Sequence, residues 1–517
     1  MIIFKTYSWP RKNGCACRFV NACAITLLAL GVLGCASKVD SITLIHFSDY
    51  HANALPRLNE QGQEQAGIAR AIAFLRQQKS PATLIFSGGD MMNKGAPAWS
   101  DKYRCTEWPW FNSLVDAMAL GNHDSDYGSA LLQECREQIN FPILSANTLG
   151  ANGQPAFAHE GKNYTVYQVE NHKVGVFALA GNDFATLLKP EALPIQGVQF
   201  LDRAESARKI VELLRKQEAV DVVVLIGHAP FEEDIALVHA VNGIDLIFGS
   251  HSHREVALFQ IPETHSYYIS AGPYLSQMSK VELSFKDSQR PQFEGEVVPM
   301  LTSISPAEDI QISVAKMQDD LQKDPIYADQ FEVIGELPFA LREPKGFQSD
   351  SLLGNYVCDV VRTATEADVV MLTSSTFRKG IPMGAVKEHH LSDALPYDNK
   401  LHLYSVRGAQ LRRIIEYSAQ RRESDFFSQI SGFRFNLVDG QVRNLLIGEP
   451  GKQRQLQDDV LYRLVTSDYQ SQIATGYSEL LAGQQFSVFD RTLRTLVREE
   501  LRSPRTPVKQ DRRISSN

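Results

Sequence analysis

Seven side chains with metal-binding atoms follow five short apolar runs in the first half of the chain. These side chains are Asp49, His51, Asp90, Asn122, His228, His251 and His253. Their oxygen and imidazole donors suit two borderline divalent ions such as Zn²⁺, Mn²⁺ or Fe²⁺. Asp90 is the natural bridging ligand, because the two glycines before it let the backbone approach the ions closely.

The apolar runs are expected to be buried strands that alternate with helices. Strands are predicted at 42–47, 83–86, 173–180, 221–226 and 244–248, with helices at 66–77 and 110–119. Open α/β sheets place their sites at the carboxyl edge of the strands, so the seven side chains should converge there. A single Asp-x-His or His-x-His motif is weak, since an isolated surface histidine is usually only solvated. Five such run ends favour a metal site over a purely structural cluster.

The second half repeats the α/β pattern after a connector at about 300–345, which contains a helix at 306–323. The elements expected beyond it are helices at 352–363 and 407–418 and strands at 368–373 and 462–467. This alternation predicts an α/β protein with a second, smaller α/β domain.

The composition of the 517-residue chain is that of a globular protein, with 44% hydrophobic and 22% charged residues. Its 52 basic and 60 acidic residues give a formal net charge of −8. A broad face for binding a nucleic acid polymer is therefore not expected. The apolar runs are too few and too short for a protein that crosses a membrane many times.

Residues 1–34 are predicted to be an export signal. Four basic residues precede an apolar run at 22–33, which is shorter than a comfortable membrane span. The run ends in Gly34-Cys35, which resembles the signal of bacterial lipoproteins. Lipidation of Cys35 would anchor the chain to a bacterial membrane, in the periplasm or at the cell surface. A plain secretory signal and an uncleaved anchor are the alternatives.

Three cysteines other than Cys35 follow the signal. Cys105 and Cys135 could form a disulfide in an oxidising compartment or remain free thiols. Cys358 is expected to be a small core residue. At the other end, 491–517 should form one last amphipathic helix followed by a polar, frayed tail.

Five sequence blocks in the first half resemble the calcineurin-like metallophosphoesterases. They are Asp49-Tyr50-His51, Gly89-Asp90, Gly121-Asn122-His123-Asp124, Gly227-His228 and Gly249-Ser250-His251-Ser252-His253. Their order and spacing are most similar to the exported 5′-nucleotidase branch, which includes UDP-sugar hydrolases and 2′,3′-cyclic phosphodiesterases. The resemblance implies a four-layer α-β-β-α catalytic domain at 35–300. The residues around Asp49 depart from the family pattern, with Ser48 before it and Ala52 after His51, but the ligand positions are present.

The resemblance also assigns the ligands. It places one ion on Asp49, His51, Asp90 and His253, and the other on Asp90, Asn122, His228 and His251. His123 occupies the position of the catalytic histidine, and Asp126 that of the partner orienting it. The implied reaction is attack of a metal-bound hydroxide on phosphorus, with His123 as cationic stabiliser or general acid. A helix N-cap is the alternative role for Asp126.

The second half resembles the C-terminal substrate domain of the same family, at 341–490 beyond a linker at 301–340. The resemblance implies that Phe427 and Tyr469 stack on a nucleoside base and that Arg378 reaches phosphate or ribose. The alternatives are two core aromatics and a surface salt bridge. Two segments depart from the family: the glycine-rich segment before Arg378 is Thr-Ser-Ser-Thr, and Thr475 replaces an aspartate that contacts sugar.

Three functional hypotheses follow. The first is an exported two-metal phosphohydrolase that acts on nucleotides in the manner of a 5′-nucleotidase. The second keeps the hydrolase and changes the ester to a UDP-sugar, a 2′,3′-cyclic nucleotide or a thiosulfate ester. The third is a non-catalytic, nucleotide-binding surface lipoprotein. The oligomeric state is left open.

Overall fold

The computed structural model describes residues 40–58, 64–94, 97–150, 152–156, 162–187, 198–285, 290–344, 347–449 and 451–516. The predicted signal at 1–34 and Cys35 lie outside the described residues. Across these ranges, the helices are all too short or too polar to span a membrane.

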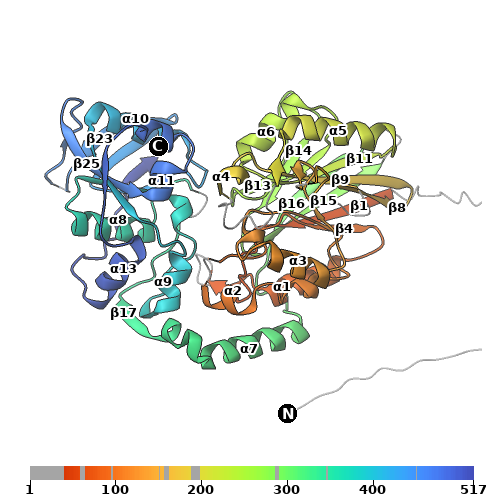
Figure 1. Cartoon of the computed structure of the whole chain (residues 1–517), viewed down its shortest axis with the longest axis horizontal. Helices are drawn as coiled ribbons and strands as arrows, with labels where there is room; N and C mark the ends of the chain where they lie inside the picture. The colour runs from red at the N-terminus through yellow and green to blue at the C-terminus, as the bar shows by residue number, and fades with distance from the viewer. Residues whose placement is uncertain are drawn as a thin grey trace, which may run out of the picture. The chain divides into compact units, whose positions relative to one another are not determined.

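Two six-stranded sheets form the centre of the first half (Figure 1). The first sheet has the order β16 (Gln292–Pro299), β15 (Gln277–Phe285), β1 (Asp40–Phe47), β4 (Thr83–Ser87), β5 (Ala117–Ala119) and β6 (Ile143–Leu144). The second has the order β13 (Glu255–Gln260), β14 (Tyr267–Ala271), β12 (Leu246–Phe248), β11 (Val222–His228), β9 (His172–Ala180) and β8 (Tyr164–Val169). Buried side chains of both sheets, such as Phe86 and Val224, share one core between them.

Helices cover the outer face of each sheet (Figure 1). The first sheet is covered by α1 (Ile68–Gln78), α2 (Pro97–Tyr103) and α3 (Ser129–Gln138), and the second by α5 (Arg203–Lys216) and α6 (Phe231–Ala240). Because β4 and β11 are buried on both faces, their sequences are nearly continuous apolar runs. The predicted four-layer α-β-β-α arrangement is confirmed. The minor elements of this half are β2 (Arg57–Leu58), β3 (Glu64–Gln65), β7 (Thr148–Leu149), α4 (Phe184–Leu187) and β10 (Gln199–Phe200).

The prediction of a helix at 110–119 is wrong. The chain forms a 3₁₀ turn, η1 (Trp108–Phe111), and then the strand β5, which pairs in parallel with β4 and β6. All three residues of β5 are fully buried. A short apolar run inside a sheet cannot be distinguished from a buried helix by its periodicity, so only the pairing partners decide it.

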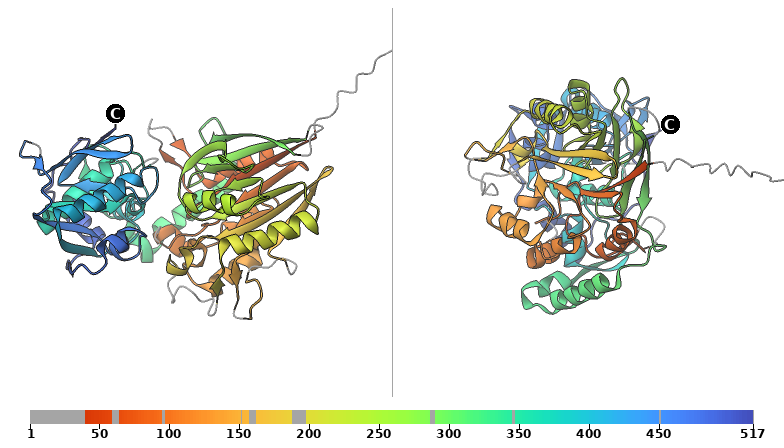
Figure 2. Two further views of the ribbon diagram at one scale, coloured as in Figure 1. Left: turned by 90° about the horizontal axis from the view of Figure 1, so that it is seen from above. Right: turned by 90° about the vertical axis from the view of Figure 1, so that its right-hand side faces the viewer.

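The second half is a separate α/β unit with its own buried cores, seen in cyan to blue in Figure 2. The linker contains α7 (Glu308–Lys323) and the 3₁₀ turn η3 (Pro325–Phe331), and β17 (Val333–Leu337) pairs with β19 (Gly384–Lys387). A five-stranded sheet has the order β21 (Ser428–Ser431), β18 (Val369–Thr373), β25 (Leu461–Ser467), β20 (Leu401–Arg407) and β26 (Phe486–Val488). Its helices and 3₁₀ turn are α8 (Leu352–Thr365), η4 (Ser374–Thr376), α9 (Glu388–Ala394), α10 (Gly408–Gln420), α11 (Asp468–Gln472) and α12 (Tyr477–Leu481).

The end of the chain is ordered against this second unit. The helix predicted after 491 is α13 (Leu493–Arg502), but the tail beyond it is not frayed. It ends in β27 (Ile514–Ser516), which extends the sheet β24 (Arg454–Gln455), β23 (Gln441–Ile447) and β22 (Phe433–Val438). The guanidinium of Arg513 is buried and lies 2.7 Å from Asp359, which explains why so polar a segment is held in place.

The cysteine alternatives are also resolved. Cys105 and Cys135 form a disulfide, and Cys358 is a buried free thiol of α8.

Candidate active site

The seven predicted ligands converge at the carboxyl edge of both sheets. Asp49 and His51 follow β1, Asp90 follows β4, and Asn122 follows β5. In the other sheet, His228 ends β11, and His251 and His253 follow β12. Five of the seven have positive φ, between 49° and 65°, which is uncommon for residues with a side chain. Such strained conformations persist only when packing holds them, and they cluster at functional sites.

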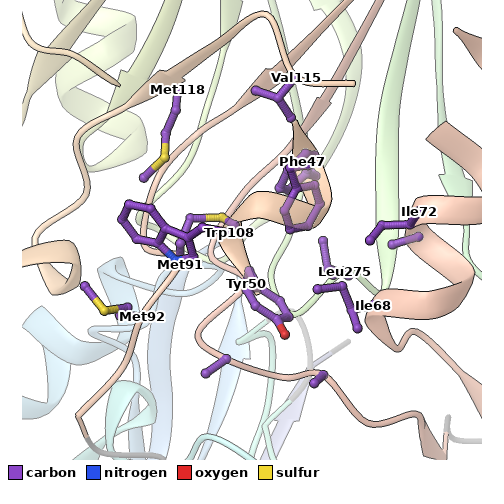
Figure 3. Packing of buried hydrophobic residues seen from close by; sticks show 14 of the residues in the cluster. Phe47, Tyr50, Ile68, Ile72, Met91, Met92, Trp108, Val115, Met118 and Leu275 are labelled. Atoms are coloured by element: carbon purple, nitrogen blue, oxygen red, sulfur yellow. The ribbon is translucent and has the colours of Figure 1, made fainter. Parts of the chain in front are cut away.

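Two glycines, Gly89 and Gly121, allow close backbone packing around Asp90. A Cβ on Gly121 would lie 2.2 Å from both the backbone nitrogen and Oδ1 of Asp90. A Cβ on Gly89 would lie 2.6 Å from the carbonyl of Ala119. Below these loops, Phe47, Tyr50 and Met91 pack with Trp108 in the core shown in Figure 3. The loops therefore rest on a rigid base.

The donor atoms form three overlapping groups, each with atoms within 4.8 Å of one another. In the first group, His253 Nε2 lies 3.0 Å from His51 Nε2 and 3.5 Å from Asp49 Oδ1. The groups centred on Asp90 use its Oδ2, which lies 3.3 Å from His228 Nε2 and 3.6 Å from His51 Nε2. The remaining predicted ligand joins through a contact of 3.0 Å between Asn122 Oδ1 and His251 Nδ1. Asp90 thus faces both halves of the set.

The chemistry of these donors fits divalent ions. Nδ1 of His228 contacts the carbonyl of Gly88 at 2.5 Å, while its buried Nε2 has no hydrogen-bond partner. That arrangement presents Nε2 as a ligand, and a buried polar atom without a partner is costly. Burial and the nearby guanidinium of Arg378 lower the pKa of His253 to about 4, which keeps its imidazole neutral.

The two shared carboxylates are held ionised. Burial opposes ionisation most strongly, but neighbouring histidines lower the pKa of both Asp49 and Asp90 below the usual value. Burial lowers the pKa of His228, but the negative charge of Asp90 outweighs burial and raises this pKa to about 9. The carboxylates therefore attract positive charge to the position where the donors converge. The residues present fit a pair of divalent cations.

His123 belongs to the donor group that contains His51 and Asp90, and it is paired with Asp126. His123 Nδ1 is 2.8 Å from Asp126 Oδ2, and the backbone N–H of His123 donates to Asp90 Oδ1 at 2.8 Å. Asp126 is not a helix N-cap, since the cap of α3 is Gly128. Burial opposes a charged His123, yet Asp126, Tyr397 and Asp90 together raise its pKa well above the usual value.

Two aspartates in the site were not predicted. Asp183 Oδ2 lies 2.8 Å from His251 Nε2 and orients that imidazole. It follows β9 in the segment Gly181-Asn182-Asp183, so the same strand-end rule could have found it. Asp124 is fully buried and accepts hydrogen bonds from the backbone N–H groups of Asp90, Met91 and Gly121. It therefore ties together two of the ligand loops.

Side chains of the second half also contact this site. Nη1 of Arg378, the predicted substrate contact, lies 2.9 Å from His253 Nδ1. Arg378 Nη2 donates to the hydroxyl of Tyr397 at 3.3 Å. That hydroxyl lies 3.3 Å from His123 Nε2. Tyr397 was not predicted as a site residue.

The two predicted stacking rings differ in exposure. Phe427 is fully buried in the core of the second unit, so its ring faces are covered as the core alternative requires. Tyr469 is half-buried. It packs against the same core, and burial, Asp425 and Asp183 raise its pKa. The structure thus encloses Phe427 and leaves Tyr469 partly exposed.

Comparison with known proteins assigns both units. Residues 42–255 match the family model of the calcineurin-like phosphoesterases, and residues 332–482 match that of the 5′-nucleotidase C-terminal domain. This chain is a calcineurin-like phosphoesterase with a 5′-nucleotidase C-terminal domain. The family predicted from the five sequence blocks is therefore confirmed. The chain is a metal-dependent phosphoester hydrolase.

Several known proteins are similar to this phosphoesterase over most of its length. A 5′-nucleotidase of Diplobatis ommata is 24% identical over 89% of this chain and 87% of its own length. A 5′-nucleotidase of Vibrio cholerae is 22% identical over 86% and 87%. Among solved structures, a 5′-nucleotidase precursor from Thermus thermophilus covers 92% of this chain and 99% of its own, with 22% identity and a TM-score of 0.71. A sulfate thiohydrolase of Thermus thermophilus covers 92% and 96%, with 20% identity and a TM-score of 0.68. At these identities, the solved structures show a common fold.

Proposed function

We propose that this phosphoesterase is exported and removes phosphate from nucleotides with two metal ions. The observation that carries the proposal is the convergence of metal-binding side chains in three overlapping groups, two of which share Asp90, with His123 in one of them and paired with Asp126. The named 5′-nucleotidases that align with nearly the whole chain support the substrate class.

The chain offers a complete ligand set for each ion. Asp49, His51, Asp90 and His253 would hold one, and Asp90, Asn122, His228 and His251 the other. When bound, two divalent cations lower the pKa of water and offset negative charge on the phosphoryl oxygens.

The chain's own residues complete the reaction. Arg378 would bind the phosphoryl oxygens, since its guanidinium points at the ligand His253. As water attacks phosphorus, the bond to the leaving oxygen breaks and its electron pair stays on that oxygen. His123 would give its Nε2 proton to this oxygen, while Asp126 holds the opposite nitrogen and supports the cation.

A thiosulfate ester is the second candidate substrate. The enclosed ring of Phe427 and the presence of Thr475 weaken the expected nucleoside site. The similarity of the fold to a sulfate thiohydrolase is compatible with this alternative.

The decisive experiment is hydrolysis by purified residues 36–517 with Mn²⁺, Zn²⁺ or a chelator. AMP, UDP-glucose, 2′,3′-cyclic AMP, an aryl phosphate and a thiosulfate ester form the panel. Asp90→Ala should lower metal-dependent turnover by at least about 100-fold. Asp309→Asn, which removes an exposed pairing partner of Arg76, is the matched control and should retain activity. Turnover that survives Asp90→Ala would refute the two-metal proposal, and turnover of the sulfur ester alone would establish the alternative.

We also propose that Cys35 carries a lipid anchor, on the motif Gly34-Cys35 after an apolar run. In a Gram-negative host, the full chain should fractionate with membranes, and Cys35→Ser should release it to the soluble fraction. Unchanged fractionation of Cys35→Ser would refute the anchor.

A further inference from the structure

The structure assigns a positioning role to Tyr397: it holds the imidazole of His123 from the side opposite Asp126. This inference rests on the proposed function of His123 as the proton donor to the leaving group. It extends that function by making the orientation of His123 depend on a residue of the second unit.

The imidazole of His123 has a partner at each of its two nitrogens and two neighbouring rings. Asp126 Oδ2 lies 2.8 Å from Nδ1, and the Tyr397 hydroxyl lies 3.3 Å from Nε2. The rings of His123 and Tyr397 are stacked, with centroids 6.3 Å apart and planes 23° from parallel. On its other side, His123 meets the ring of His51 at 5.1 Å in an edge-to-face contact. An imidazole held at both nitrogens and beside two rings has one preferred orientation.

Tyr397 can impose this orientation because it is itself held firmly. Arg378 Nη2 donates to its hydroxyl at 3.3 Å, and the guanidinium lies 5.5 Å from the centroid of its ring. The segment before it is anchored as well. The backbone N–H of Arg378 donates to the carbonyl of Ala394, and Leu395 is buried in the core.

Arg378 therefore links the two ends of the site. Its Nη1 contacts His253, a candidate ligand, while its Nη2 contacts Tyr397, which faces His123. A substrate phosphate bound by Arg378 would lie next to the two metal ions, and the tyrosine fixed by the same guanidinium would hold His123 with Nε2 facing the site. The leaving oxygen would then replace the Tyr397 hydroxyl as the partner of the Nε2 proton. Binding of phosphate and orientation of the proton donor are thus joined through one side chain.

The inference predicts that the effect of removing the Tyr397 hydroxyl on kcat depends on the leaving group of the substrate. A nucleoside is a poor leaving group and needs the proton of His123, whereas a nitrophenolate leaves readily without one. Tyr397→Phe keeps the stacked ring and removes only the hydroxyl contact. Its kcat with AMP should fall by about 10-fold, with KM within about 2-fold, while kcat with the aryl phosphate should change by less than about 2-fold.

Two further measurements separate positioning from general damage. Tyr462→Phe is the matched control, because it removes a hydroxyl contact to the backbone N–H of Gln457 in the same unit, outside the candidate site. It should leave both activities unchanged. In the metal-free protein labelled with ¹⁵N-histidine, the His123 imidazole signals, identified by their loss in His123→Gln, should shift in Tyr397→Phe and remain in place in Tyr462→Phe.

Equal loss with both substrates, no loss with either, or unmoved His123 signals would overturn the inference. Its failure can be distinguished from failure of the proposed function. If the unmodified chain hydrolyses no phosphate ester with any metal, the proposed function fails, and the imidazole signals still decide whether Tyr397 positions His123.

Discussion

Cys105 and Cys135 are joined by a disulfide that encloses the segment carrying Asn122, His123 and Asp126. The bridge connects Cys105, which lies two residues beyond α2, to Cys135, a buried residue of α3. A candidate metal ligand and the proposed proton donor thus lie on one covalently closed loop.

Removing this disulfide should destabilise the protein. A closed loop of 30 residues lowers the entropy of the unfolded chain enough to contribute about 3–4 kcal/mol. Cys105→Ser/Cys135→Ser should therefore unfold at lower denaturant concentration than the unmodified protein, as followed by far-UV circular dichroism. A reductant should shift the unmodified protein toward the variant and leave the variant unchanged. Equal midpoints for the two proteins would contradict the expectation.

Asp183→Asn should weaken binding of one metal ion. The carboxylate contacts His251 Nε2 at 2.8 Å, and loss of such a partner typically lowers metal affinity by about 10–100-fold. Titration of the apoprotein with Mn²⁺ or Zn²⁺ in a calorimeter would show one weakened site of two. Asp319→Asn, which breaks an exposed ion pair with Lys323 in α7, should leave both sites intact. Two unaltered sites in Asp183→Asn would show that the contact does not support a ligand.

Glu107 should make stability depend on pH. Burial raises its pKa to about 7, despite the hydrogen bonds that it accepts from Tyr50 and Trp99. Because the folded state holds this proton more tightly than the unfolded state, stability should fall as the pH rises from about 4.5 to about 7, by up to about 3 kcal/mol.

Glu107→Gln tests this pH dependence, since the amide does not ionise. Between pH 5 and pH 7.5 the unmodified protein should lose stability relative to the variant in chemical denaturation. The same change with pH in both proteins would exclude Glu107 as the source.

Arg513→Ala should destabilise the second unit by about 3–5 kcal/mol, because it leaves the buried carboxylate of Asp359 without its partner. Thermal unfolding would measure the loss. Arg512→Ala, at the exposed neighbouring position, is the matched control and should change stability by less than about 0.5 kcal/mol. Restoring an uncharged pair in Arg513→Met/Asp359→Leu should recover much of the loss. A small effect of Arg513→Ala would show that β27 is held by its backbone pairing alone.

The candidate metal ligands could be identified from the sequence because their positions at strand ends follow from local rules. Parallel strands bring their carboxyl ends to one edge of a sheet, so Asp49 and Asp90, which follow the neighbouring strands β1 and β4, were expected to lie close together. His228 joins them because the second sheet packs on the first. Gly89, one of the two glycines before Asp90, does pack closely against the backbone of Ala119 and Gly121. The family resemblance assigned the same residues, and the C-terminal helix after 491 followed from its amphipathic pattern.

Other features depended on pairing partners that no local pattern contains. The short apolar run ending at Ala119 is a strand because β4 and β6 bind it on both sides. The tail after Pro504 is ordered because Arg513 finds a buried carboxylate 154 residues away in sequence. Phe427 is enclosed by side chains of its own core, although the motif around it resembles a substrate site.

The contacts around His123 show most clearly which features follow from the local sequence and which depend on the tertiary structure. Asp126 is three residues away, so its contact could be predicted from spacing alone. Tyr397 is 274 residues away and reaches His123 only because the second unit packs against the ligand loops in the folded chain. Sequence by itself determined which residues are candidates for the chemistry, since their types and strand-end positions are local. Tertiary structure decided which residues orient them, since those contacts join segments distant along the chain.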